Sequence, residues 1–182
     1  MASSSDPTAT PSVRFGRVAI VVMGVSGAGK TTVGRLLAGR LGVEFIDGDD
    51  LHSPATRAKM AAGQALDDAD RWPWLDRIAA ALADPAAPRG RVIACSALKR
   101  AYRDRLRAGA GAGLRFVYLE ANPDLMRKRV AGRRGHYMPA SLVDSQFAAL
   151  EPPAREADVV TIAADADLDV AIPQLVAELA RS

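Results

Sequence analysis

The chain contains little of what small secreted proteins and membrane proteins depend on. Cys95 is its only cysteine, which excludes an internal disulfide and a cysteine zinc site and suits a reducing compartment such as the cytoplasm. The longest aliphatic run, Val18 to Met23, has only the length of a strand, so no membrane-spanning helix and no membrane partner are expected. With 182 residues, 49% of them hydrophobic, the chain is long enough to fold as one domain around its own core.

Lysine is also scarce, because only four of the 24 basic residues are lysines and the rest are arginines. Arginine suits two-point contacts with phosphate or carboxylate groups, although a general preference for Arg and Ala accounts for most of these residues equally well. Against 21 acidic residues the formal net charge is only +3. This small excess, without a single basic stripe, disfavours nucleic acid as a partner.

The organisation of the chain is read from its apolar periodicity. Residues 1–14 are rich in Ser, Thr and Pro and are expected to form a disordered leader, which leaves residues 15–182 as a single domain. Strands are predicted at 18–23, 43–46, 91–95, 114–119 and 159–162, and helices at 30–41, 53–61, 72–82, 98–106, 122–131, 140–150 and 168–180. The alternation predicts an α/β fold with a parallel five-stranded sheet between helices.

A glycine-rich segment follows the first predicted strand and opens the first predicted helix. Residues 24–31, GVSGAGKT, match G-x-x-x-x-G-K-[ST] at every fixed position, which predicts a P-loop NTPase fold. Lys30 is expected to reach the β- and γ-phosphates of ATP, and Thr31 to offer its hydroxyl to Mg²⁺. The alternative is a glycine-rich turn without a ligand. The residues expected to bind the nucleotide are Gly24, Val25, Ser26, Gly27, Ala28, Gly29, Lys30, Thr31 and Thr32.

Carboxylates and a histidine follow the second predicted strand, in the segment DGDDLH over residues 47–52. In a parallel sheet the carboxyl ends of the strands face the ligand crevice, so three carboxylates and a histidine are expected near the terminal phosphate. They are Asp47, Asp49, Asp50 and His52. One carboxylate can orient Mg²⁺ through water, and another can accept the proton of an attacking hydroxyl. The alternative is that these acids cap the next helix or form a solvated turn. A guanine-reading Asn-Lys-x-Asp is absent, since the only asparagine precedes a proline, which disfavours a regulatory GTPase.

Together these motifs resemble those of the gluconokinases, small P-loop kinases related in fold to shikimate and adenylate kinases. The matching segments cover residues 18 to 153 in the family's order, and they are GVSGAGKTT (24–32), FIDGDDLH (45–52), AAGQALDDADRWPWL (61–75), CSALKRAYRDRLR (95–107), VYLEA (117–121), RRGHYM (133–138) and LVDSQFAALEPP (142–153). The resemblance implies phosphoryl transfer from MgATP to the 6-hydroxyl of D-gluconate, in a cytoplasmic homodimer of carbohydrate acid metabolism.

The resemblance also implies roles for individual residues. Asp49 would contact the acceptor hydroxyl, and Asp47 would be an outer-shell magnesium ligand behind Thr31. The implied catalytic residues are Lys30, Asp49 and Arg133, and the implied acceptor pocket consists of Asp49, His52, Lys59, Arg71, Ser96, Lys99, Arg134 and His136. Arg71 could instead form a salt bridge with Asp67 or Asp68. Lys59 could instead be a solvated helix lysine, and His52 a helix cap or a packing residue.

A small mobile lid over about residues 127–140 is implied as well. Arg129 and Arg133 are neighbours at i,i+4 and would close over the phosphates, as lid arginines do in similar kinases. By analogy the adenine would lie near residues 163–165. The alternative is a basic helix end stabilised by the helix dipole.

Three other functions compete with this interpretation. Another small-acid kinase, such as a shikimate kinase, shares the loop chemistry and differs in acceptor selectivity. A non-catalytic ATP-binding switch would need no acceptor base, and a nucleic-acid kinase would need a stronger positive charge. Turnover stimulated by D-gluconate alone separates a gluconokinase from all three.

Overall fold

The computed structural model describes residues 16–131 and 140–181. Its centre is a parallel sheet of five strands in the order β2-β3-β1-β4-β5. The strands are β1 Val18–Met23, β2 Glu44–Asp47, β3 Gly90–Ala94, β4 Arg115–Glu120 and β5 Val159–Ala163. The predicted α/β class and the parallel five-stranded sheet are therefore confirmed. Residues 1–14, expected as a disordered leader, lie outside the described residues.

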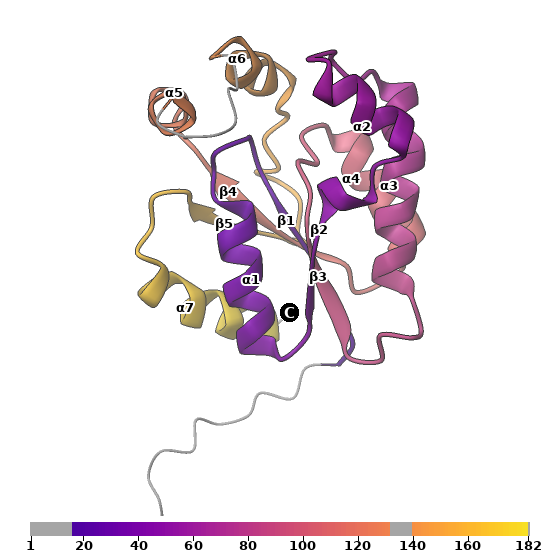
Figure 1. Cartoon of the computed structure of the whole chain (residues 1–182). Helices are drawn as coiled ribbons and strands as arrows, with labels where there is room; N and C mark the ends of the chain where they lie inside the picture. The colour runs from indigo at the N-terminus through magenta and orange to yellow at the C-terminus, as the bar shows by residue number, and fades with distance from the viewer. Residues whose placement is uncertain (1–15, 132–139, 182) are drawn as a thin grey trace, which may run out of the picture.

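Helices cover both faces of the sheet (Figure 1). They are α1 Lys30–Leu41, α2 Pro54–Ala61, α3 Asp68–Ala83, α4 Arg100–Ala110, α5 Pro123–Ala131, α6 Ala140–Ala149 and α7 Leu168–Ala180, with a short 3₁₀ turn, η1 Gly48–Leu51, after β2. α1 and α7 pack on one face, and α3 and α4 on the other. Within the described part of the chain, no helix has the length and apolar character needed to cross a membrane.

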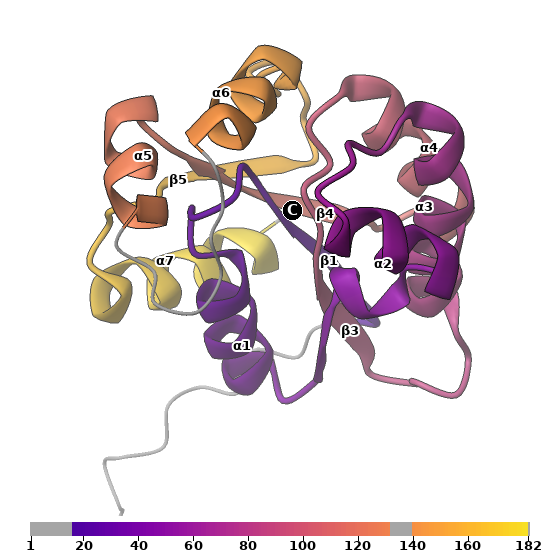
Figure 2. The same cartoon turned by 45° about the horizontal axis from the view of Figure 1, so that its top comes forward.

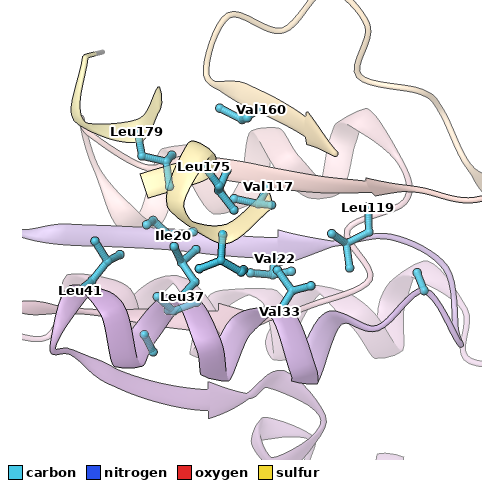
Figure 3. Close-up of a cluster of buried hydrophobic side chains, with 14 of the residues drawn as sticks. Ile20, Val22, Val33, Leu37, Leu41, Val117, Leu119, Val160, Leu175 and Leu179 are labelled. Carbon is cyan, nitrogen blue, oxygen red and sulfur yellow. The ribbon is translucent and has the colours of Figure 1, made fainter. Parts of the chain in front are cut away.

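The two cores follow from the alternation of side chains along each strand. In β1, Ile20 and Val22 face α1 and α7, whereas Val21 and Met23 face α3 and α4. Figure 3 shows the first of these clusters, in which Leu37 of α1 packs against the strand side chains. Because both faces are covered, the strands read as continuous apolar runs, which is the pattern that identified them in the sequence.

The sheet order places β1 between β3 and β4. From β1 the chain crosses to β2 at one edge, and from β3 it crosses back to β4 on the other side of β1. In open α/β sheets, ligands bind outside the carboxyl ends of the strands, where the winding direction reverses. The loop that leaves β1 lies at this position, in the upper part of Figure 1.

The start of α3 differs from its predicted position. The sequence predicts a helix over 72–82, but the helix begins four residues earlier, at Asp68. Asp67 caps it: its side chain accepts the Asp70 N–H at 2.8 Å, and the Asp70 side chain accepts the Asp67 N–H in return. The helix predicted over 98–106 is also shifted, since α4 spans Arg100–Ala110.

Candidate active site

The glycine-rich loop joins β1 to α1 as predicted. Gly24, Gly27 and Gly29 have φ angles of 140°, 85° and 98°, a region that residues with a side chain rarely adopt. A Cβ on Gly24 would lie 3.0 Å from the Leu119 carbonyl oxygen, so the loop passes close to β4. α1 then begins at Lys30 without a side-chain cap and without an acidic residue in its first turn. This helix end favours an anion.

Two loop residues make contacts that prepare the phosphate site. Lys30 Nζ donates to the Val25 carbonyl at 3.0 Å, so the lysine side chain folds back over the loop. Thr31 Oγ1 donates to Asp47 Oδ2 at 3.0 Å, which joins the loop to the end of β2. The other Asp47 oxygen accepts the Asp49 N–H at 3.2 Å and starts the η1 turn. One carboxylate thus holds the loop threonine and the acidic turn together.

The DGDDLH turn is packed tightly against β3 and α3. A Cβ on Gly48 would lie 2.2 Å from the Ala94 carbonyl oxygen, so this position accepts only glycine. Trp74 Nε1 donates to the Gly48 carbonyl at 2.6 Å, which fixes the turn on α3. Trp74 is itself buried in the core on this face of the sheet. Its contact with the acidic turn was not foreseen.

His52 lies beside the turn, stacked on Trp74 with ring centroids 4.3 Å apart and planes 12° apart. The histidine is 5% exposed, and its Nδ1 has no hydrogen-bond partner among the described residues. Burial, followed by the positive charges of Arg71 and Arg77, lowers the pKa of His52 to about 4. His52 is therefore a neutral imidazole at physiological pH, able to accept or donate one hydrogen bond at each ring nitrogen.

The pKa of Asp49 is shifted upward, in the opposite direction to that of His52. Partial burial of its carboxyl raises the pKa, and repulsion from Asp47 and Asp50 adds to this effect, while the positive charge of Lys30 opposes it. A carboxylate with a raised pKa is a better proton acceptor, so the environment of Asp49 suits a group that orients and deprotonates a hydroxyl.

The basic residues predicted to bind the acceptor substrate differ in whether they already have a carboxylate partner. Lys59 Nζ pairs with Asp70 at 2.6 Å, and Lys99 Nζ pairs with Asp68 at 2.8 Å. Each pair raises the pKa of its lysine, chiefly through the hydrogen bond to the carboxylate. Arg71 has no carboxylate partner among the described residues, so the alternative salt bridge with Asp67 or Asp68 is not formed.

Arg71 lies instead over an aromatic ring, with its guanidinium carbon 5.8 Å from the centroid of Tyr102. The Tyr102 hydroxyl donates to Asp68, the partner of Lys99. The first turn of α3 and the start of α4 therefore form one polar cluster beside the acidic turn. Within that cluster Arg71 is the cation best placed to meet a carboxylate from outside.

The loop after β3 brings Ser96 to the same edge. The Ser96 carbonyl accepts the Gly24 N–H at 3.3 Å, which ties this loop to the phosphate loop. The next residue, Ala97, has a φ of 42°, and the buried Arg103 holds the carbonyls of Ala97 and Leu98 at 3.0 Å each. Arg103 is thus a supporting residue that the sequence interpretation missed, since its signal was only one arginine among twenty. Cys95 is buried, and burial raises the pKa of its thiol to about 12, so this thiol is a poor nucleophile at neutral pH.

α5 and α6 lie on the side of β4 and β5, away from α2 and α3 (Figure 2), and their side chains make a second group of contacts. Arg129 Nη1 donates to the Ala164 carbonyl at 3.0 Å, so this arginine reaches the loop expected to hold the adenine. Arg127, in contrast, pairs with Asp124 and Asp144. Gln146 of α6 contacts Ser26 of the phosphate loop, which no motif predicted. Arg133, Arg134 and His136 and most of the expected lid lie outside the described residues.

The donor atoms suit magnesium better than a transition metal. Thr31 and Asp47 supply oxygen atoms, which Mg²⁺ prefers, and Mg²⁺ usually binds one or two such groups together with substrate phosphates. No cluster of three or more His, Cys, Asp or Glu side chains suited to a metal occurs among residues 16–131 and 140–181. Any resident ion would therefore depend on the nucleotide for much of its coordination.

Comparison with known proteins agrees with this geometry. A family model described as "AAA domain" matches residues 20–153. The chain is 47% identical over 152 residues to a probable gluconokinase of Schizosaccharomyces pombe, covering 80% of this chain and 79% of the relative. It is 46% identical to the gluconokinase of Gluconobacter oxydans, with coverage of 86% and 88%. The crystal structure of a gluconokinase from Sinorhizobium meliloti 1021 superposes with a TM-score of 0.83 at 43% identity, with coverage of 92% and 94%.

Proposed function

This chain belongs to the gluconokinase family of P-loop kinases, and from that premise we propose that it phosphorylates D-gluconate on the 6-hydroxyl with ATP. The observation that carries the proposal is the Thr31–Asp47–Asp49 chain of contacts. It joins the phosphate loop to an acid whose pKa is raised, at the sheet edge where phosphate and acceptor must meet. A nucleotide switch needs no such acid. The position of transfer rests on the family alone.

The nucleotide side of the site is formed by the loop and α1. Backbone N–H groups of the loop and the N-terminus of α1 would hold the phosphates, with Lys30 neutralising the terminal ones. Thr31 would bind Mg²⁺ directly and Asp47 through water, and the ion would neutralise charge that develops on the phosphates. Arg129 and residues 163–165 would flank the adenine.

The acceptor side is formed by the acidic turn, α3 and the loop after β3. Arg71 would bind the carboxylate of gluconate, and the neutral His52 and Ser96 would hydrogen-bond its hydroxyls. Lys59 and Lys99 are paired with Asp70 and Asp68, and these ion pairs would fix the position of both lysines in the wall of the pocket. From that wall the two ammonium groups would contact gluconate. Asp49 would accept the hydroxyl proton as the new oxygen–phosphorus bond forms and the bond to the leaving ADP oxygen breaks. Arg133, Arg134 and His136 remain proposals from the family resemblance.

The decisive experiment is ADP formation from MgATP with D-gluconate, with shikimate, with other sugar acids and with no acceptor. We expect strong stimulation by gluconate and its conversion to 6-phosphogluconate. Lys30→Met, verified to be folded, is the control that removes the charge at the phosphates, and its turnover should fall by at least about 10²-fold. Equal slow ADP release with every acceptor would indicate an ATPase or a switch, and preference for shikimate would indicate the other small-acid kinase.

Two further properties follow the family in this proposal. We expect a homodimer, to be checked by light scattering on the purified protein, and a cytoplasmic location, to be checked by fractionation. Removal of Mg²⁺ with a chelator should abolish turnover, and added Mg²⁺ should restore it.

A further inference from the structure

Gln146 connects α6 to the phosphate loop through two hydrogen bonds. Its Oε1 accepts the backbone N–H of Ser26 at 2.6 Å, and its Nε2 donates to Ser26 Oγ at 2.9 Å. The two residues are 120 positions apart in the chain. A single carboxamide thus engages both the backbone and the side chain of one loop residue.

The contact engages Ser26, whereas its neighbours in the loop are held in other ways: the Gly24 N–H donates to the Ser96 carbonyl, and Val25 and Ala28 are buried in the core. The Ala28 N–H bonds to the Val25 carbonyl, and Lys30 Nζ bonds to the same carbonyl, so these ties stay within the loop and its helix. Among the described residues, Gln146 supplies the side-chain contact to the loop backbone from a separate element. Ser26 lies at the tip of the loop, between the base at Gly24 and the helix start at Lys30.

α6 itself is held firmly enough to position this side chain. Val143 is fully buried in the core beneath the helix, and Phe147 packs against the same core. Gln146 is half-buried between them and the loop. The glutamine is therefore presented to the loop by a helix anchored in the core.

The chemistry of the side chain also fits an anion site. A carboxylate at this position would accept the Ser26 N–H but repel phosphate, and an ammonium group would supply no acceptor. A carboxamide supplies one acceptor and one donor without a charge. It can hold the loop tip without altering the electrostatic potential that the phosphates meet.

We propose that Gln146 is a positioning residue that pre-organises the phosphate loop for the nucleotide. With the tip held by the core-anchored α6, the loop is ordered before the phosphates arrive, and binding loses less conformational entropy. The inference rests on the proposed role of the loop in nucleotide binding. It assigns to α6 a function in the nucleotide site beyond packing.

The test is calorimetric binding of MgADP to the wild-type protein and to Gln146→Ala. We expect the dissociation constant to rise about three- to tenfold, the range for ordering one or two side chains or a short loop. The KM for gluconate should stay within about twofold. Gln174→Ala is the matched control, because Gln174 is an exposed residue of α7 and its loss should leave MgADP binding unchanged.

Gln146→Glu tests the second part of the argument, that the side chain holding the loop should carry no charge. The new carboxylate keeps the shape and one acceptor but brings a negative charge to the loop tip, so the loss of affinity should be larger for a non-hydrolysable ATP analogue than for ADP. If Gln146→Ala does not fold, Ser26→Ala removes only the contact to the hydroxyl and should weaken MgADP binding in the same direction.

The outcomes distinguish this inference from the proposed function. If wild-type protein fails to bind MgADP, the proposed function itself is wrong. If wild-type protein binds MgADP and folded Gln146→Ala binds it equally well or more tightly, the positioning role is wrong. A lower melting temperature with unchanged affinity would likewise reduce Gln146 to a structural tie.

Discussion

At the scale of single residues, Asp49 is the group whose reactivity depends most on its neighbours. Its raised pKa comes first from burial and then from repulsion by Asp47, with Asp50 adding a smaller part. A proton acceptor must be ionised, so activity should be lost as the pH falls through this raised pKa. We expect the acid limb of kcat/KM for gluconate to lie above the range of an ordinary aspartate.

Asp49→Asn should lower kcat by about 10²-fold or more, because the amide cannot accept the proton. Steady-state ADP formation at saturating MgATP measures this. Asp50→Asn is the matched control: Asp50 is the next carboxyl of the same turn and acts on Asp49 only through its charge, so its removal should keep kcat within about twofold while moving the acid limb to lower pH. A change in Asp49→Asn confined to KM would make Asp49 a binding residue instead.

Arg71 is distinguished from Lys59 and Lys99 by its lack of a carboxylate partner among the described residues. If it binds the gluconate carboxylate, Arg71→Ala should raise the KM for gluconate at least about tenfold, the range for losing a charged hydrogen bond. The KM for ATP should not change. Initial rates at varied gluconate and fixed, saturating ATP give this value.

Arg105→Ala is the comparison for this experiment, because Arg105 is an exposed arginine of the neighbouring α4 that pairs with Asp76. It should leave both KM values unaltered. Equal effects of Arg71→Ala on the two substrates would argue for a general disturbance of α3 and against carboxylate binding.

At the scale of elements, the start of α3 shows where sequence patterns fail and why. Apolar periodicity begins near Trp72, so the prediction began there. The preceding turn is polar and is stabilised by the reciprocal Asp67–Asp70 cap, which replaces the usual Glu or Gln of a capping box by Asp. Periodicity cannot reveal a turn held by caps and ion pairs.

The contribution of this cap to the free energy of unfolding can be measured. Asp67→Ala should lower the free energy of unfolding by about 1 kcal/mol, since it leaves N-terminal N–H groups of α3 without an acceptor. Asp67→Asn keeps an acceptor and should remain within about 0.5 kcal/mol of wild type. Urea unfolding at neutral pH distinguishes the two variants, and equal stability of Ala and Asn would show that the cap contributes nothing.

At the scale of the whole molecule, the parallel topology could be predicted and the pairing of distant side chains could not. Strand alternation predicted the class, and the rule for carboxyl ends predicted that Asp47 and Ser96 would reach the loop's edge, which they do. The contacts Lys99–Asp68 and Gln146–Ser26 join residues 31 and 120 positions apart and depend on how separate elements pack in space. No local pattern encodes that packing.

The same limit applies to the network that ties α4 to the segment before β5. Arg103 is 1% exposed and pairs with Glu156, which also accepts from Arg107. Arg103 also donates to the Ala97 and Leu98 carbonyls in the loop after β3, so the network fixes the backbone that directly follows Ser96. These hydrogen bonds lower the pKa of Glu156 from 4.5 to about 2.

Glu156→Gln should therefore destabilise the protein by about 3 kcal/mol at neutral pH, because Arg103 is left buried without its counter-charge. The pH dependence has a definite sign. A depressed pKa contributes stability above 4.5, the value of the unfolded chain, and this contribution is lost as the pH falls toward about 2. The difference between wild type and Glu156→Gln should stay constant down to about pH 4.5 and shrink below it.

Urea unfolding between neutral pH and about pH 3 measures this difference. Asp104→Asn is the control, since Asp104 is exposed and pairs with Arg107 on the outside of the same network, where a surface pair contributes less than about 1 kcal/mol. A difference that is small at neutral pH, or that grows on acidification, would contradict the role of Glu156. If the variant folds but has a higher KM for gluconate, the network also positions the acceptor loop, as its contacts with Ala97 and Leu98 lead us to expect.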